Sequence, residues 1–476
     1  MQLDTAPVKC IKPILAFLTG IPFLVLPVAA QNNHSFIRRL HPAPLSVLQV
    51  DLKVKVSPAP VKACAFLRFY DSLDHELLEY KSAPVSSDTL QETGFYTEAP
   101  PYTNYATVSV EPDSGKPAEI TVEGFHADPQ EGVPEKKFAP LCDLDQYMRP
   151  FWKSDTIFNE TVLLYSRNGM AATGRLLFQP DKILSVQRFD LKTTYSEKED
   201  YFVNGRTIGR RPNSKMPFRA DTSFNTRDDL AWFNLQSQWV VVTYTHRDKW
   251  EGQVPAYKGN SMPRTLAKLR SKSPLRIVGY GMSITRGLDV SSYDTVAPFM
   301  PTYLQLFTRA LKKQFGYGDI QLYNAGLPGA KADWGASYAD QYINPLKPDL
   351  VIIDFGMNDF WIYKPEEFSA FIQTIIQKVK RANPEAEFLL LSNMKFDPDY
   401  VLDPDKNKAF YLGNMEGYNT GLQKLVVTGI TDLDMTTISG YIYSRKKAKD
   451  CLANPLHPND YLARWYAQGM AAIFRK

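Results

Sequence analysis

The sequence has few histidines and cysteines, and it lacks both a dense basic block and an internal repeat. Its 476 residues include 6 histidines and 4 cysteines. With 55 Lys and Arg against 51 Asp and Glu, the net charge is only +4, so we expect an ordinary solvated surface and no nucleic-acid partner. A composition that is 44% hydrophobic and 22% charged is typical of a soluble globular protein and argues against disorder.

Long apolar runs are also scarce, and the one that stands out lies near the N-terminus. Residues 14–28 are apolar, follow two lysines and end in small residues. This order predicts a secretory signal peptide over residues 1–30, cleaved after Ala30. A transmembrane anchor is the alternative, but the run contains two prolines and is short for a bilayer span. We therefore expect a secreted or periplasmic protein with no stable membrane span after signal removal.

The cysteines support only a limited disulfide prediction. Cys10 is expected to leave with the signal peptide, which leaves three cysteines in the mature chain. Cys64 and Cys142 are able to pair in an oxidising compartment if they lie close together, and the sequence leaves that open. Cys451 lies near His457 and suggests a thiol nucleophile, although one odd buried cysteine is the commoner explanation.

The first half of the chain is patterned as β-structure. In residues 50–56, apolar and charged side chains alternate with the period of two that is typical of a half-buried strand. Short strands separated by turn residues predict a β-sandwich module over residues 31–149. Residues 150–260 are predicted to form a second β-rich module, or one unit with the first. Further predicted strands are 65–70, 105–110, 120–124, 161–165, 174–178 and 239–245.

From residue 261 to 476 the pattern changes to strands that alternate with helices, which predicts a parallel sheet with crossover helices. Apolar residues recur at helical spacing in 368–379, and a last helix is predicted to start at the capping residue Asn459. His457 then lies on the loop before that helix. The predicted strands are 275–280, 320–323, 349–355, 388–392 and 426–430.

A glycine-flanked serine follows the first of these strands. The apolar run 275–280 leads into GMSITRG at 281–287, which is expected to present Ser283 at the carboxyl end of the strand, where open α/β sheets carry their chemistry. Serine is a weak nucleophile unless a base removes its proton. His457 is the only histidine after residue 271.

Two further segments, NAGLPG at 324–329 and FGMND at 355–359, follow predicted strands. Together with GMSITRG and NPLH at 454–457, they resemble the four sequence blocks of the SGNH/GDSL hydrolases, serine esterases and lipases on a flavodoxin-like sheet. The resemblance implies that Ser283 is the nucleophile and His457 the base. It also implies an oxyanion hole made by the N–H groups of Ser283 and Gly329 and the side-chain amide of Asn358, with no metal and no cofactor.

The chain departs from the family pattern at two positions. Met282 stands where the family has an aspartate before the serine, so a hydrogen bond from that carboxylate is missing under the turn. Asn454 stands where the family has the triad aspartate, three residues before the histidine. Asn454 is therefore expected to orient His457 in a Ser-His dyad, with Asp450 as the alternative partner.

These observations predict a secreted serine esterase. The combination of a β-sandwich with an SGNH domain resembles certain acetylxylan esterases, which implies removal of O-acetyl groups from a polysaccharide or oligosaccharide. Trp334 and Trp361, close after Gly329 and Asn358, are possible sugar-stacking residues, although large aromatics more often serve packing. One alternative is a lipase, lysophospholipase or thioesterase. The other is a carbohydrate-binding protein with a decayed hydrolase domain.

We expect Ser283→Ala and His457→Ala each to remove nearly all esterase activity, because both side chains lie in loops where they serve chemistry rather than core packing. Hydrolysis of a small acetyl ester measures the loss. The thermal unfolding midpoint of each variant is expected to stay close to wild type. A Ser283→Ala variant that retained most of the wild-type kcat would show that another group attacks the ester.

Overall fold

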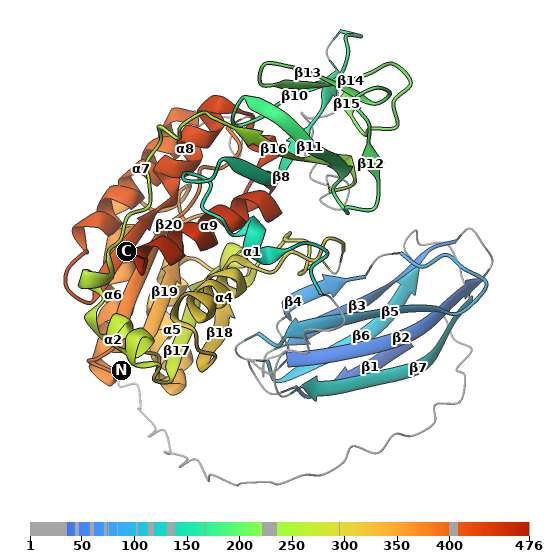
Figure 1. Ribbon diagram of the computed structural model, residues 1–476. Helices are drawn as coiled ribbons and strands as arrows, with labels where there is room; N and C mark the ends of the chain where they lie inside the picture. Colours follow the sequence, from blue (N-terminus) through green and yellow to red (C-terminus); the bar gives the residue numbers. More distant parts are fainter. Residues whose placement is uncertain are drawn as a thin grey trace.

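The computed structural model describes residues 36–475 except 43–46, 58–60, 71–73, 75, 83, 101–102, 113–118, 131–138, 167, 221–235, 295 and 399–407. Figure 1 shows a β-sandwich beside a larger body in which a second β-rich module lies against a helix-covered sheet. The predicted signal peptide, residues 1–30, lies outside the described residues. No helix in the described part of the chain is long and apolar enough to cross a bilayer.

The N-terminal sandwich contains two antiparallel sheets, of order β1-β6-β3-β4 and β5-β2-β7. The period-two pattern explains strand β2, in which Val50, Leu52 and Val54 are buried while Lys53 between them is exposed. The inward side chains of both sheets form one apolar core. The strands are β1 Phe36–Leu40, β2 Val47–Ser57, β3 Ala63–Tyr70, β4 Glu76–Lys81, β5 Gln91–Glu98, β6 Tyr105–Pro112 and β7 Glu119–Gln130.

The second β-rich module also contains two sheets, of order β12-β11-β16-β8 and β13-β14-β10-β9-β15. Strand β16, the run Trp239–His246, is buried along nearly its whole length, as its continuous apolar sequence predicts. The other strands are β8 Thr156–Leu163, β9 Tyr165–Ser166, β10 Thr173–Arg175, β11 Pro180–Arg188, β12 Thr194–Tyr195, β13 Tyr201–Asn204, β14 Thr207–Arg210 and β15 Arg219–Ala220.

The C-terminal domain is built on a parallel five-stranded sheet of order β18-β17-β19-β20-β21. In chain order this is 2-1-3-4-5, the flavodoxin-like arrangement, so the carboxyl ends of all five strands meet at one edge. The fold class predicted from sequence is confirmed. The strands are β17 Leu275–Gly281, β18 Ile320–Gly326, β19 Leu350–Asp354, β20 Glu387–Ser392 and β21 Ile430–Asp434. The last strand therefore begins where the predicted strand 426–430 ends.

Helices connect these strands, and α4 packs against α9 while α5, α6 and α7 pack in series. The predicted amphipathic stripe lies on α6, and Asn459 caps α9 by accepting from two backbone N–H groups. The helices are α1 Leu144–Tyr147, α2 Pro263–Ser271, α3 Ser283–Arg286, α4 Tyr303–Phe315, α5 Ala332–Tyr342, α6 Pro365–Ala382, α7 Lys408–Lys424, α8 Met435–Arg445 and α9 Asp460–Ile473.

The second β-rich module is joined to the α/β domain, and the two share one hydrophobic core. The guanidinium of the buried Arg464, on α9, donates to the carbonyl oxygens of Phe158 and Asn159, both at 2.8 Å. The predicted alternative, that residues 150–260 form one unit with the first sandwich, is therefore wrong. The predicted boundary near residue 260 separates two sequence patterns, but one core extends across it. Apolar patterning could not show this, because it does not reveal which element a buried face packs against.

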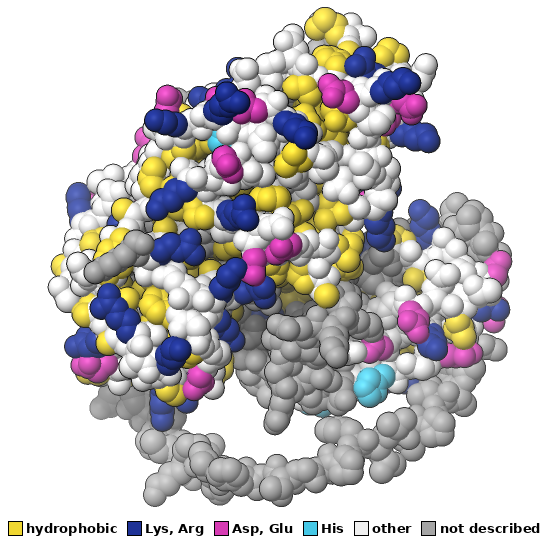
Figure 2. Space-filling model, viewed as in Figure 1, with side chains coloured by type: hydrophobic (Ala, Val, Ile, Leu, Met, Phe, Trp, Pro, Cys, Tyr) yellow, Lys and Arg dark blue, Asp and Glu magenta, His cyan; other side chains and the backbone are white. Residues whose placement is uncertain are grey.

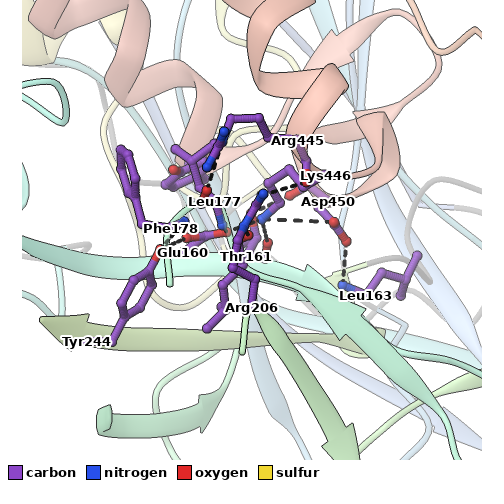
Figure 3. A network of polar contacts seen from close by, with 12 residues as sticks. Glu160, Thr161, Leu163, Leu177, Phe178, Arg206, Tyr244, Arg445, Lys446 and Asp450 are labelled. Atoms are coloured by element: carbon purple, nitrogen blue, oxygen red, sulfur yellow. Dashed lines mark hydrogen bonds and ion pairs between the residues drawn. The ribbon is translucent and has the colours of Figure 1, made fainter. Parts of the chain in front are cut away.

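A buried polar network fastens this joint (Figure 3). The Glu160 carboxylate, on β8, pairs with the Lys446 ammonium and accepts from Tyr244 Oη at 2.6 Å and from the backbone N–H of Leu177 at 2.8 Å. Lys446 also donates to the Thr161 carbonyl oxygen at 2.8 Å. Burial by itself lowers the pKa of Lys446, but the Glu160 and Asp450 carboxylates outweigh it and raise that pKa above the usual lysine value.

The surface charge is mixed, as the composition predicts, and the two cysteines lie in different parts of the structure. Figure 2 shows Lys and Arg side chains scattered together with Asp and Glu side chains over the face in view. Cys64 and Cys142, which are both among the described residues, are not joined by a disulfide. Cys64 is buried on β3 of the sandwich, whereas Cys142 packs against the core of the α/β domain. Nearness in sequence does not bring the two thiols together.

Lys446→Met is expected to destabilise the protein by about 3–5 kcal/mol, because it leaves the buried Glu160 carboxylate without its counter-ion. Urea unfolding of the full chain measures the change. Adding Glu160→Gln to Lys446→Met is expected to recover part of the loss, since the double variant holds no unpaired buried charge. Lys313→Met, which removes an exposed partner of Asp145, is the matched control and is expected to unfold close to wild type. Equal effects of Lys446→Met and Lys313→Met would show that the buried ion pair does not hold the joint.

Candidate active site

The serine lies in a tight turn between β17 and α3. Ser283 is the first residue of α3 and is only 5% exposed. Gly281, at the end of β17, is needed for lack of space, because a Cβ there would lie 2.1 Å from Thr285 Oγ1 and 2.2 Å from the Asp354 carbonyl oxygen. The turn therefore packs directly on the end of β19, and Ser283 is held at the carboxyl edge of the sheet.

The turn is held without an aspartate at position 282. The backbone N–H of Met282 donates to Thr285 Oγ1 at 3.1 Å, and that hydroxyl donates to Asp354 Oδ2 at 3.0 Å. Burial raises the pKa of Asp354 to about 6, while hydrogen bonds from Tyr303, Thr285 and other donors act in the opposite direction. Thr285 and Asp354 thus supply a hydrogen-bonded support beneath the turn from residues that follow the serine or lie on the next strand.

The structure brings Ser283 and His457 together, although 173 residues separate them in the chain. Ser283 Oγ lies 2.7 Å from His457 Nε2, and His457 Nδ1 contacts Asp289 Oδ2. Because a carboxylate only accepts, Nδ1 carries the proton and Nε2 is left to accept from the serine hydroxyl. The imidazole and carboxylate side chains are 7% and 14% exposed. A serine, histidine and aspartate linked in this order can activate the hydroxyl as a nucleophile.

The partner of the imidazole differs from both residues expected from sequence. The structure places Asp289 Oδ2 against Nδ1. Asn454 Oδ1 accepts from the backbone N–H of His457 at 3.1 Å, and its Nδ2 donates to Asp289 Oδ2 at 2.7 Å. Asp450 is buried, and its Oδ1 accepts from the backbone N–H of Leu163 at 2.8 Å. The prediction that Asn454 or Asp450 orients the imidazole is corrected, because Asn454 supports the carboxylate and Asp450 belongs to the joint with the β-rich module.

Asp289 was missed because the family spacing directs attention to the position three residues before the histidine. Asp289 instead follows the serine by six residues, just after Gly287 ends α3 with φ +96°. A carboxylate so soon after the nucleophile turn, combined with a neutral residue at position 454, was the available signal. Its reach to His457 depends on how the turn packs, which the sequence alone does not reveal.

The predicted oxyanion residues lie on loops that are tied to the nucleophile turn. The backbone N–H of Leu327 donates to the Gly281 carbonyl oxygen at 3.1 Å, which anchors the loop of Gly329. Gly329 has φ +76°, a conformation that favours glycine, and the space where a Cβ would lie is open. Asn358 Nδ2 donates to the Ala330 carbonyl oxygen at 2.9 Å and lies 3.8 Å from Met282 Sδ. Since a thioether is a weak acceptor, the second amide hydrogen of Asn358 remains available to a stronger one.

Asp359 joins the two oxyanion loops. Its carboxylate accepts from the backbone N–H of Ala332 at 2.8 Å and from that of Gly356 at 3.0 Å. Burial raises its pKa to about 7, and the two backbone donors act in the opposite direction. Asp359 thereby fixes the spacing between the loop of Gly329 and the loop of Asn358.

The two candidate sugar-stacking tryptophans have packing partners. The Trp334 ring lies 6.0 Å from that of Tyr280, 5.4 Å from that of Tyr338 and 5.8 Å from that of Tyr342, centroid to centroid. Trp361 packs edge-to-face on Phe360 at 4.9 Å and is half-buried. Trp334 thus belongs to an aromatic cluster, and both tryptophans are half-buried.

Cys451 is buried, and burial raises the pKa of its thiol well above the usual range, which disfavours the reactive thiolate. Within the described ranges, no group of three or more His, Cys, Asp or Glu side chains is arranged to hold a metal ion.

Comparison with known proteins gives a family for the C-terminal part. Residues 280–464 match the model of the GDSL-like lipase/acylhydrolase family. No curated protein sequence matches the chain significantly. The similar solved structures include three esterases. A two-domain esterase active on acetylated mannans, crystallised with mannopentaose, is 21% identical over 47% of this chain and 54% of its own, with a TM-score of 0.36. An acetyl xylan esterase is 18% identical over 41% of this chain and 98% of its own, with a TM-score of 0.33.

The third is a family 3 carbohydrate esterase from Talaromyces cellulolyticus, which is 14% identical over 42% of this chain and 94% of its own, with a TM-score of 0.32. The chain spans about half the length of the two-domain esterase.

Asp289→Asn is expected to lower kcat on a small acetyl ester by about 10⁴-fold, because an amide neither fixes the same tautomer nor stabilises the imidazolium. Asn454→Ala removes only a hydrogen bond to that carboxylate, so its expected loss is on the order of tenfold. Asp450→Asn is expected to lower stability more than kcat per folded molecule. Steady-state kinetics with unfolding midpoints separate these effects. A near-normal kcat for Asp289→Asn together with an inactive Asn454→Ala would instead support a Ser-His dyad in which Asn454 orients the imidazole.

Proposed function

We propose that this protein is a serine esterase with Ser283, His457 and Asp289 as its catalytic triad, since residues 280–464 match the model of the GDSL-like lipase/acylhydrolase family. The observation that carries the proposal is the continuous chain of contacts from Ser283 Oγ through the imidazole to the Asp289 carboxylate. The acid differs from the one that the family spacing implies. Its chemical role is the same, because it orients the imidazole and balances the charge that develops there.

In the proposed reaction, His457 Nε2 takes the proton of Ser283 Oγ as the oxygen attacks the ester carbonyl carbon. The tetrahedral intermediate then collapses, the bond to the alcohol oxygen breaks, and the imidazolium returns its proton to that oxygen. An acyl-serine remains. His457 then takes a proton from a water molecule as the water oxygen attacks the acyl carbon. The bond to Ser283 Oγ breaks, the imidazolium returns the proton to Oγ, and the carboxylic acid and free Ser283 are released.

The developing oxyanion is stabilised by the backbone N–H groups of Ser283 and Gly329 and by the Asn358 amide. The support for this assignment is that the loops of Gly329 and Asn358 are fastened to the nucleophile turn and to each other. Preorganised donors of this kind typically contribute about 100- to 1000-fold each to the rate. The Asp359 carboxylate keeps the two loops in register, so it acts on the oxyanion hole through Ala332 and Gly356.

We further propose that the ester is an O-acetyl group on a polysaccharide or oligosaccharide and that the protein is secreted or periplasmic. The predicted export signal and the N-terminal β-sandwich are consistent with a polymeric extracellular substrate. Trp334 and Trp361, which are both half-buried, are the candidate residues for contact with a sugar ring.

The alternative of a decayed hydrolase domain rested on Met282 and Asn454. Each of these departures has a compensating group in the structure. Thr285 and Asp354 support the turn in place of an aspartate at 282, and Asp289 supplies the acid that position 454 lacks. Retention of a complete hydrogen-bonded set argues for an active enzyme.

We expect the purified protein to release acetate from at least one member of a panel of acetylated xylan, mannan, glucomannan, pectin and peptidoglycan. Mass spectrometry of the released acid measures the activity, and Ser283→Ala is the matched control. A parallel series of nitrophenyl esters from acetyl to dodecanoyl is expected to show a steep loss with chain length. Preference for long acyl esters without acetate release would favour the lipase alternative. Inactivity on every ester would contradict the proposed function.

A further inference from the structure

The carboxylate of the proposed triad lies on a short segment that we name the acid loop, residues 287–294. The loop is internally compact, because the backbone N–H groups of Tyr293 and Asp294 donate to the Val290 carbonyl oxygen at 2.9 and 3.1 Å. Asp289 itself has φ +65°, in the left-handed region that residues other than glycine rarely adopt. Such a conformation persists only where the surroundings hold it. Three contacts hold this loop.

The first hold comes from the segment that carries the histidine. Asp460, three residues after His457, accepts from the backbone N–H of Ser291 at 2.8 Å and from its Oγ at 2.6 Å. This link runs parallel to the contact between Asp289 and His457. It ties the loop to the N-terminus of α9, within the α/β domain itself.

The second hold comes from the β-rich module that shares the α/β core. Gln236 Nε2, directly before β16, donates to Asp294 Oδ2 at 2.6 Å. Burial, followed by the nearby charge of Asp289, raises the pKa of Asp294 well above its usual range. The amide contact fastens the end of the acid loop to the β-rich module.

The third hold comes from the N-terminal sandwich. Tyr80, on the edge strand β4, places its ring 4.8 Å from that of Tyr293, centroid to centroid, at 34°. Tyr80 is 7% exposed, and Tyr293 packs against the sandwich core although it belongs to the acid loop. Figure 1 shows β4 at the edge of the sandwich nearest the α/β domain. The sandwich thus contacts the loop four residues from the proposed catalytic carboxylate.

We propose that the N-terminal sandwich is part of the active site, with Tyr80 as a positioning residue that acts on Asp289 through Tyr293 and the acid loop. Gln236 has the same role from the second β-rich module. The inference rests on the proposed function, since it assigns the acid loop a catalytic consequence. It predicts that the sandwich affects the hydrolysis of small soluble esters and not only of polymers.

The test compares Tyr80→Ala with Tyr80→Phe and Leu78→Ala in the full chain. Leu78 is the matched control because it lies two residues away on the same strand and is also 7% exposed. Tyr80→Ala is expected to lower kcat on a small acetyl ester about tenfold with KM little changed, because a displaced catalytic group costs rate rather than binding. Tyr80→Phe keeps the ring contact, so its kcat is expected to stay close to that of the wild type. Leu78→Ala is expected to lower the stability of the sandwich and leave kcat near wild type.

A double-mutant cycle separates positioning from general damage. If Tyr80 acts through Asp289, Tyr80→Ala is expected to have almost no further effect on the residual kcat of Asp289→Asn. An equal fold-loss in both backgrounds, or an equal loss from Leu78→Ala, would overturn the inference. A wild-type kcat for Tyr80→Ala would also overturn the inference about the sandwich. The proposed esterase function would still stand in that case, provided that Ser283→Ala is inactive. If Ser283→Ala stays active, the proposed function fails instead.

Discussion

The joint around Lys446 and Glu160 is the constraint on which the rest of the structure depends. A buried ammonium is tolerable only beside a carboxylate and full hydrogen-bond partners, so Glu160, Thr161 and Lys446 have to meet in one arrangement. That arrangement fixes the end of α8 against β8. The chain then continues through Asp450, which binds the backbone of Leu163, to the hairpin β22 Leu452–Asn454 and β23 His457–Pro458. The histidine is thereby placed by contacts that begin in a different module.

In the candidate active site, the acidic groups come from other positions than the family motif implies. Met282 and Asn454 are neutral where the family motif has aspartates. Carboxylates nevertheless lie beneath the nucleophile turn and beside the imidazole. Asp354 reaches the nucleophile turn through Thr285, and Asp289 reaches the imidazole directly. Asn454 then becomes a donor to the acid rather than its replacement. Several backbone segments end at the same edge of the sheet. A carboxylate from any of them can therefore occupy the same place in space, although it comes from a different position in the sequence.

The modules of this protein are also less separable than their sequence patterns. The second β-rich module shares its core with the α/β domain, and the sandwich reaches the acid loop through a tyrosine pair. Both joints use large, nearly buried side chains, which contribute apolar contact area in addition to their polar ends. We infer that the three parts of the chain act together, because both β-structured parts contact the segments that position the candidate site residues.

The sequence by itself determined what depends on local pattern. Period-two alternation identified β2, helical spacing identified α6, and the order of four motifs identified the flavodoxin-like sheet and selected Ser283, Gly329, Asn358 and His457 as candidate site residues. Tertiary structure alone decided the partner of His457, the state of Cys64 and Cys142, and the joining of the second β-rich module to the α/β domain. Each of these depends on a contact between segments whose separation in the chain says nothing about their separation in space. Side-chain periodicity records which face of an element is buried, but the neighbour that covers that face is chosen only when the whole chain packs.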